Sequence, residues 1–192
     1  MKKLIILLAV VACSCKRGND KTPHVIIETS LGDIEIELYA EKAPVTTAAF
    51  LSYIDSGYYS KSSFYRVLKA DELPNDNNTG VIQGGIWKSN PERKVKIPGI
   101  KHEPTSQTGL SHVSGTISLA RLQPGTANTE FFICIGDQNQ FDYGQTDTED
   151  GLGYAAFGKV VTGMPVVREI QEQKSHGDQF DKPIQIYRIK RD

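Results

Sequence analysis

The stretch GDIEIELY at residues 32–39 alternates apolar and charged side chains along its length. Side chains of a β-strand point alternately to opposite faces, so this pattern predicts a strand with one face in a core and the other in water. The preceding stretch, HVIIET at residues 24–29, has the same character and is predicted to pair with it in a hairpin. Residues 30–32 form the predicted turn.

The rest of the chain predicts further short strands, because apolar runs recur between turn-forming residues. Only two stretches have the spacing of a helix. The first begins at Pro44, which suits the first helical turn, and ends before Gly57. The second follows Pro165 and ends near Gln173. The predicted strands cover residues 63–68, 81–85, 116–120, 131–135, 156–161 and 184–189.

The helical spacing of the first helix predicts that Val45, Ala49, Phe50 and Tyr53 face the core. Residues 88–114 are rich in Pro, Gly, Ser, Lys and His and are predicted to be irregular. Many short strands with two helices predict a mainly β fold, either a closed barrel or a sandwich.

The composition is that of an ordinary globular protein, with 39% hydrophobic and 23% charged residues among 192. This length predicts one domain that can bury a core without disulfides or a metal. The 22 basic and 23 acidic residues give a formal net charge of −1. Because there is no basic excess, we expect no nucleic-acid partner. We also expect the protein to be a monomer.

Residues 1–12 are predicted to be a signal peptide of the lipoprotein type. Lys2 and Lys3 precede an apolar run that is shorter than the roughly 20 residues needed to cross a bilayer. The sequence VVAC resembles a bacterial lipobox, so Cys13 is expected to become the lipidated first residue of the mature chain. Residues 13–23 are predicted to be a flexible tether, and residues 24–192 the folded domain.

Two alternatives stay open at this end of the chain. The segment also fits a plain signal peptide with a nearby cysteine, and Cys15 competes with Cys13 as the lipid acceptor, although it follows a poorer lipobox. The third cysteine, Cys134, lies in an apolar run and is predicted to be a small buried hydrophobic residue. A single thiol in the folded part cannot form an internal disulfide.

Common motifs of nucleotide, zinc and hydrolase chemistry are missing from the sequence. It contains no phosphate-binding loop, no HExxH and no GxSxG, and no Cys/His pair has zinc spacing. We therefore expect neither a metal nor a cofactor.

Five short segments follow one another along the chain, namely FYRV (64–67), VIQGG (81–85), GTISLAR (115–121), NTEFFI (128–133) and GYAAFGKVVTGM (153–164). The first two resemble the FHRV…MIQGG signature of cyclophilins, and the next two resemble their GTLAMAR…FFI segment. The last resembles the strand and turn before the second helix of bacterial members. The resemblance covers nearly everything from about residue 24 to residue 190.

This resemblance implies a closed antiparallel β-barrel of about eight strands capped by two α-helices. It also implies peptidyl-prolyl cis–trans isomerisation, which needs no cofactor. Resonance in the X–Pro bond sets a rotation barrier of roughly 18–20 kcal/mol. A fixed donor that hydrogen-bonds the proline nitrogen as it turns pyramidal favours the twisted state over both planar states.

Arginine suits this role because its guanidinium is always charged and rigidly forked. The resemblance implies that Arg66 is the catalytic residue. Alternation along the strand predicts that Arg66 points to one face and that Tyr65 and Val67 point to the other. From the local sequence alone, Arg66 fits equally well a surface arginine paired with Asp or Glu.

The resemblance also implies an apolar pocket for the proline ring, with Phe132 as its floor and Val81 as a side wall. Alternation by itself leaves open whether Phe132 is plain core. Gln83 is expected to contact the peptide backbone and to hold the arginine, while Ala120 and Arg121 pair with the substrate as an added strand. The other substrate-binding residues implied by the resemblance are Phe64, Tyr65, Phe141 at the groove rim and Tyr154 facing the proline ring.

Three departures from the family pattern lie in the same segments. Tyr65 replaces the His of FHR, and Glu130 replaces the Gln before FFI, where it is expected to add a charge at the groove edge. Gly80 stands where the family usually has Phe, and the loop before it is longer. One pocket wall is therefore missing or supplied by Leu68 or Leu73. These changes predict weakened or substrate-selective isomerase activity.

The predicted function is a peptidyl-prolyl isomerase that assists the folding of exported proteins. Its expected partners are proline-containing polypeptides, and a membrane through the N-terminal lipid. The expected location is the bacterial cell envelope, facing the periplasm or the cell exterior. Two alternatives are a tethered chaperone that binds proline segments with little or no turnover, and a purely structural envelope lipoprotein.

Overall fold

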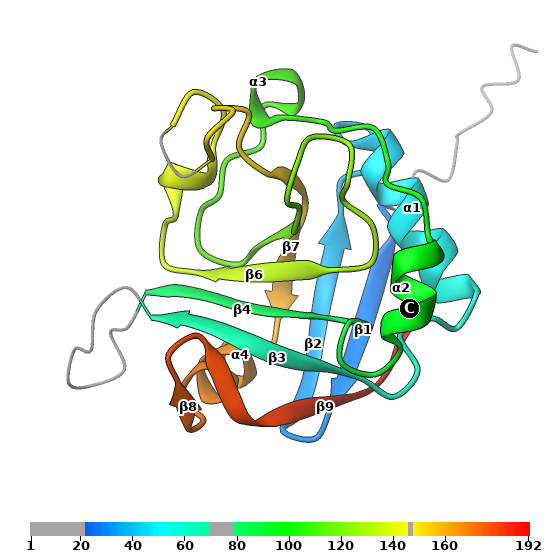
Figure 1. The fold of residues 1–192 in the computed structure, drawn as a ribbon, viewed down its shortest axis with the longest axis vertical. Helices are drawn as coiled ribbons and strands as arrows, with labels where there is room; N and C mark the ends of the chain where they lie inside the picture. The colour runs from blue at the N-terminus through cyan, green and yellow to red at the C-terminus, as the bar shows by residue number, and fades with distance from the viewer. Residues whose placement is uncertain (1–21, 70–78, 146–147) are drawn as a thin grey trace, which may run out of the picture.

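The computed structural model describes residues 22–69, 79–145 and 148–192, and over these ranges the chain forms one antiparallel sheet closed into a barrel (Figure 1). The strand order is β1-β2-β7-β5-β6-β4-β3-β9-β8, and pairing of β1 with β9 closes eight strands while β8 lies outside. The predicted mainly β barrel is confirmed. The strands are β1 (His24–Thr29), β2 (Gly32–Leu38), β3 (Ser62–Lys69), β4 (Gly80–Gly85), β5 (Thr116–Leu119), β6 (Phe131–Ile135), β7 (Ala155–Thr162), β8 (Ser175–His176) and β9 (Gln179–Arg191).

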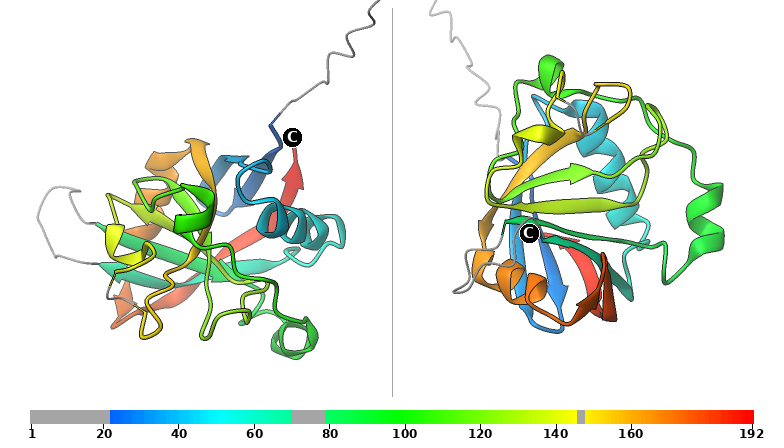
Figure 2. Two further views of the ribbon diagram at one scale, coloured as in Figure 1. Left: turned by 90° about the horizontal axis from the view of Figure 1, so that it is seen from above. Right: turned by 60° about the vertical axis from the view of Figure 1, so that its left-hand side comes forward.

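The predicted hairpin opens the barrel. β1 and β2 pair in register with Ile27 opposite Ile34, and the aliphatic residues of their inner faces, Val25, Ile27, Ile34, Ile36 and Leu38, are fully buried. The acidic residues between them lie on the outer face, as period-two alternation requires. β9 runs along the other side of β1, so the two ends of the described chain lie close together (Figure 2).

The described residues contain four α-helices, two more than predicted. α1 (Pro44–Asp55) and α4 (Met164–Gln171) match the predicted pair, and both pack against barrel strands. α2 (Pro91–Lys96) and α3 (Thr105–Thr108) lie in the segment predicted to be irregular. α2 buries no side chain, so it has no apolar periodicity to detect. Its local signal is Asn90, whose side chain accepts a hydrogen bond from Arg93 N at 3.1 Å as an N-cap.

The start of α1 differs from the predicted pattern at one residue. Val45 is 39% exposed, whereas Phe50 and Tyr53 are buried as predicted. Glu103, far along the chain, accepts hydrogen bonds from Val45 N and Thr46 N at 3.1 and 2.7 Å. This carboxylate replaces a local cap and ties the segment before α3 to the first turn of α1.

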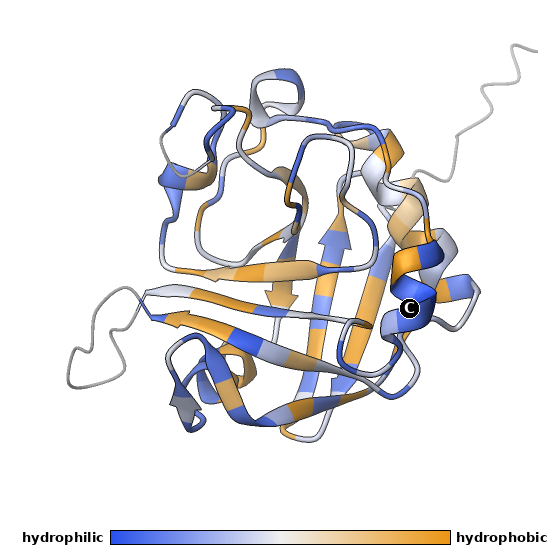
Figure 3. Ribbon diagram, viewed as in Figure 1, coloured by the Kyte–Doolittle hydropathy of each residue, from blue (hydrophilic) through white to orange (hydrophobic). Residues whose placement is uncertain are grey.

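Strand β6 separates two apolar regions. Phe131, Ile133 and Ile135 point into the barrel core, while Phe132 and Cys134 point outward into a second, smaller cluster. Figure 3 shows β6 as hydrophobic along most of its length, because neither face meets water freely. The second cluster also contains Val81 and Phe141, with Leu68, Ala120 and Tyr154 packed against it.

Residues 1–21 lie outside the described ranges, and with them the predicted signal peptide, most of the tether, Cys13 and Cys15. In the described part, no helix is both long and apolar enough to cross a bilayer. Cys134 is the free cysteine of this part and is buried, as predicted.

Candidate active site

A β-bulge in β3 brings two consecutive side chains to the same side of the barrel wall. The register of β3 against both β4 and β9 shifts between Phe64 and Arg66, and on the β4 side Tyr65 is the extra residue, because Phe64 and Arg66 lie opposite the consecutive residues Gly84 and Gln83. Tyr65 and Arg66 therefore both line an outer groove, while Phe64 and Val67 are buried in the core. The prediction that Tyr65 and Arg66 point to opposite faces is wrong, because it assumed unbroken alternation.

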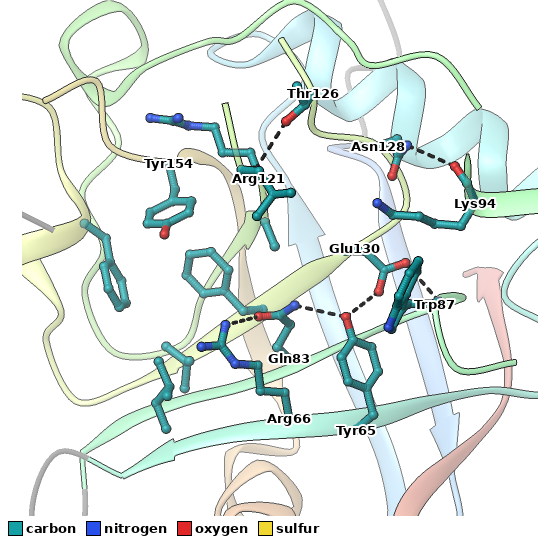
Figure 4. Close-up of a pocket in the computed structure, with 16 residues that line it drawn as sticks. Tyr65, Arg66, Gln83, Trp87, Lys94, Arg121, Thr126, Asn128, Glu130 and Tyr154 are labelled. Carbon is teal, nitrogen blue, oxygen red and sulfur yellow. Dashed lines mark hydrogen bonds between the residues drawn. The ribbon is translucent and has the colours of Figure 1, made fainter. Parts of the chain in front are cut away.

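The groove has a volume of about 460 Å³ and runs across the outer face of β3, β4 and β6 (Figure 4). It brings together every predicted substrate-binding residue except Phe64, which packs against Phe131 inside the barrel at a centroid distance of 5.7 Å. The predicted residues that line it are Tyr65, Arg66, Val81, Gln83, Ala120, Arg121, Phe132, Phe141 and Tyr154.

Three aromatic rings form an apolar slot at one end of the groove. Phe132, Phe141 and Tyr154 meet pairwise with centroids 5.3–5.5 Å apart and ring planes at 71–86°. Edge-to-face pairs of this kind each contribute about 0.5–1.5 kcal/mol beyond burial, so they hold one another in place. Phe141 comes from a single 3₁₀ turn, η1 (Asn139–Phe141).

The slot floor rests on a buried histidine. The His112 ring stacks on Phe132 with centroids 5.9 Å apart and planes at 17°. Its Nδ1 lies 2.6 Å from Asp142 Oδ1 and its Nε2 lies 3.0 Å from Ser118 Oγ. Burial lowers the pKa of His112, although the Asp142 carboxylate opposes this shift. Because the ring is buried beneath Phe132, this network supports the floor.

Leu68 lines the groove, and its backbone lies beside Gly80, the position at which the family pattern has a phenylalanine. Gly80 cannot carry a side chain here, because its φ is +137° and a Cβ would lie 1.9 Å from Leu68 O. The close pairing of β3 with β4 therefore requires glycine at this point. The other predicted wall residue, Leu73, lies outside the described residues.

Among the described residues, Asp178 in the turn before β9 and Gln83 on β4 anchor the Arg66 guanidinium. Its Nε donates to Asp178 Oδ2 at 2.6 Å, and its Nη1 donates to Gln83 Oε1 at 3.2 Å. The hydrogen bond from Arg66 lowers the pKa of Asp178. The Arg66 side chain is 37% exposed at the groove. Arg66 is therefore paired with an acidic residue, as a surface arginine often is, and can still contact a bound peptide.

A chain of hydrogen bonds continues from Gln83 beneath the groove wall (Figure 4). Gln83 Nε2 donates to the Tyr65 hydroxyl at 3.0 Å, and that hydroxyl donates to Glu130 Oε2 at 2.6 Å. Burial raises the pKa of both Tyr65 and Glu130. Glu130 lines the groove, as predicted, but it is only 6% exposed, and its carboxylate accepts hydrogen bonds from the protein itself.

The Arg121 side chain is committed to the protein itself. It donates to both Asp150 oxygens at 2.7 Å and to Gly153 O at 2.6–2.8 Å, and its guanidinium carbon lies 5.6 Å from the Tyr154 ring centroid. These contacts lower the pKa of Asp150 and secure the residues before β7. Arg121 therefore shapes the slot through Tyr154.

The far end of the groove was not singled out from the sequence. Trp87 is 43% exposed there, and the Lys94 ammonium lies 5.6 Å from its ring centroid. Asn128 donates to the carbonyls of Lys94 and Ile97 and so ties α2 to the groove. The single tryptophan, two residues after the end of β4, was a possible signal, but Lys94 and Asn128 come close to it only in the folded chain. The lining residues missed from the sequence are Trp87, Lys94, Leu122, Thr126 and Asn128.

The fold and the groove together define a class of protein: a closed antiparallel barrel that presents an anchored guanidinium beside an apolar slot. The chain belongs to the family described as "Cyclophilin type peptidyl-prolyl cis-trans isomerase/CLD", which matches residues 24–191. The resemblance to cyclophilins is thereby confirmed, and so is the enzyme class, a peptidyl-prolyl cis–trans isomerase, while the likeness to bacterial members stays a prediction.

Curated relatives and solved structures agree with this assignment. Peptidyl-prolyl cis-trans isomerase A of Dickeya dadantii is 35% identical over 170 residues, which cover 88% of this chain and 82% of the relative. Peptidyl-prolyl cis-trans isomerase of Acinetobacter baylyi is 40% identical over 147 residues, 76% of this chain and 70% of the relative. A crystal structure of a cyclophilin-type isomerase from Cryptosporidium parvum shares the fold, with a TM-score of 0.69 and 23% identity over 88% of this chain and 97% of that one. The names of the relatives do not favour a binding module without turnover.

Proposed function

We propose that this protein isomerises X–Pro bonds in polypeptides, with Arg66 donating to the proline nitrogen while the slot floored by Phe132 holds the proline ring. The supporting observation is that the anchored guanidinium of Arg66 and the apolar slot line one groove. The Cryptosporidium isomerase was also solved in the presence of the dipeptide Ala-Pro, at a TM-score of 0.67 and 24% identity. Proline-containing polypeptides are the substrates that this chemistry requires.

The reaction needs rotation without bond cleavage. When the imide twists, resonance is lost and the nitrogen lone pair becomes a hydrogen-bond acceptor, so a fixed cation stabilises the twisted state more than either planar state. Arg66 stays charged at every working pH, and Asp178 and Gln83 fix its direction. The slot holds the proline ring still while the residue before proline turns. The free energy of peptide binding therefore helps to lower the barrier to rotation about the X–Pro bond.

Replacement of Arg66 tests this mechanism. R66A should lower kcat/KM for an X–Pro peptide by about 100-fold, the usual cost of removing one preorganised donor. R66K is the matched variant, because it keeps the charge but loses the fork, and it should fall between R66A and the wild type. The rates are measured by exchange NMR, and the fold is checked by thermal unfolding. A wild-type rate in folded R66A would overturn the proposed role.

The proposal includes a lipid-anchored isomerase in a bacterial cell envelope that assists the folding of exported proteins. The support is the N-terminal sequence, in which a short apolar run precedes Cys13. The several acyl chains of a lipoprotein anchor firmly, whereas a single chain binds only marginally. In cells given a labelled fatty acid, the wild type and C15S should incorporate the label and enter the membrane fraction, whereas C13S should not. Labelling of C13S would reassign the anchor, and no labelling of the wild type would refute it.

A further inference from the structure

We propose that Glu130 is a positioning residue that acts on Arg66 through Tyr65 and Gln83, by setting the direction of the hydrogen bonds between them. The inference rests on the proposed role of Arg66. It concerns the direction of each hydrogen bond in the chain of four groove-lining side chains, Glu130, Tyr65, Gln83 and Arg66.

Glu130 is the fixed acceptor at the start of this chain. Its Oε1 accepts from Ile86 N at 3.0 Å, from Trp87 N at 3.2 Å and from Thr129 Oγ1 at 3.1 Å. Its Oε2 therefore faces the Tyr65 hydroxyl at 2.6 Å. All four partners are donors, and an ionised carboxylate can only accept.

The Tyr65 hydroxyl then fixes the orientation of the Gln83 side-chain amide. A phenol has one proton, and Tyr65 gives it to Glu130, so the hydroxyl can only accept on its other side. Gln83 meets it with Nε2 at 3.0 Å, which leaves Oε1 to face Arg66 Nη1 at 3.2 Å. A flipped Gln83 amide has nearly the same shape but would set its NH₂ group against the guanidinium, donor against donor.

The direction matters because Gln83 is one of the two anchors that the described part of the chain gives the guanidinium. Asp178 holds Nε from the opposite side, and one contact alone leaves the guanidinium plane free to tilt. A donor that must meet the proline nitrogen only in the twisted state depends on such orientation. Loss of the Gln83 contact should therefore reduce turnover more than peptide binding.

Two independent features of the chain converge on this arrangement. Tyr65 and Glu130 are both departures from the family pattern, and they lie 65 residues apart, yet their oxygens meet at 2.6 Å. Gly85 leaves room for the carboxylate, because a Cβ there would lie 2.5 Å from Glu130 Oε2. The buried carboxylate and the tyrosine thus form a matched pair.

The test is a proton-direction swap. In E130Q the new amide oxygen still accepts from Ile86 N and Trp87 N, so its NH₂ group faces Tyr65 and donates to it. The tyrosine proton then turns to Gln83, whose amide flips against Arg66. We expect kcat to fall about tenfold, with KM changed by less than about twofold.

A second substitution should restore the rate. In E130Q/Q83E the carboxylate at position 83 accepts from Tyr65 and from Arg66, so the chain works in the reversed direction. Kcat should return to within about threefold of the wild type. Q83E alone should be impaired, because two carboxylates then face one tyrosine proton. A purely structural role predicts additive losses instead of this rescue.

Matched controls separate the possible outcomes. E28Q removes another carboxylate that accepts from basic side chains, Arg188 and Lys190, outside the groove, and it should keep the wild-type rate. If R66A is inactive but E130Q is wild-type in rate, or the double variant shows additive losses, the inference is overturned while the proposed function stands. If R66A keeps the wild-type rate, the proposed function fails first.

Y65F provides a second route if E130Q does not fold. It removes the hydroxyl that orients Gln83, so kcat should again fall about tenfold. Y65F/Q83E should regain most of that loss, because a carboxylate presents an acceptor to Arg66 in either orientation. A wild-type rate in folded Y65F, or no regain in Y65F/Q83E, would overturn the inference.

Discussion

The barrel interior and the outer groove share strand β6 but are built in different ways. On the inner side Phe131 packs against Phe50, Tyr59 and Phe64 with centroids 5.7 Å apart, and apolar groups close around it. On the outer side Phe132 packs against two rings and a buried histidine, and charged and polar groups complete the groove. Stability therefore depends mainly on the inner face, whereas chemistry depends on the outer face, where apolar packing gives way to anchored polar groups.

The largest expected effect separates the two faces of β6 directly. F131A should lower the free energy of unfolding by about 3–5 kcal/mol, because it opens a cavity that the closed interior cannot fill. F132A should lower stability less, since water can enter from the groove, but it should raise KM for an X–Pro peptide strongly. Urea unfolding and isomerase kinetics on both variants measure the contrast. Equal destabilisation with an unchanged KM in F132A would remove the distinction.

The next effect tests whether the groove wall depends on backbone packing. G80A places a Cβ against Leu68 O in a backbone region that favours glycine, so the steric clash should add about 1–3 kcal/mol to the backbone penalty and displace the Leu68 wall. G57A is the control, because its φ is +68° but nothing lies within 4 Å of the added carbon. It should cost only the left-handed penalty of about 1 kcal/mol and leave KM unchanged. A G80A variant as stable as G57A would contradict the steric argument.

The smallest effect is a pH dependence beneath the slot. Burial lowers the pKa of His112 in the folded chain, so the unfolded chain binds this proton first as the pH falls. Stability should be greatest above the ordinary histidine pKa of about 6.5 and should decline below it. His102 shifts in the same direction through burial, so H102Q is the control background. Tm measured between about pH 7.5 and 5.5 should decline less in H112N/H102Q than in H102Q; an identical decline would show that other groups carry it.

The family motifs identified most of the groove-lining residues, because these residues lie within short motifs that follow one another along the chain in the family's order. Arg66, Gln83 and Phe132 line one groove, as the resemblance implied. Phe64 was predicted to bind substrate because it lies next to Tyr65 in the FYRV motif. The bulge instead sends the two side chains to opposite sides of the barrel wall, Phe64 into the core and Tyr65 into the groove. α2 escaped prediction because a helix that buries nothing leaves no periodic pattern.

By itself the sequence determined the alternating strands, the two packed helices and the family, since these depend on local periodicity and short motifs. The tertiary structure alone decided what each motif residue touches. Asp178 reaches Arg66 across 112 residues because β9 pairs with β3, and Glu130 is buried because β6 pairs with β4. Hydrogen-bond direction and burial arise only from such long-range contacts, and they fix the orientation of the guanidinium.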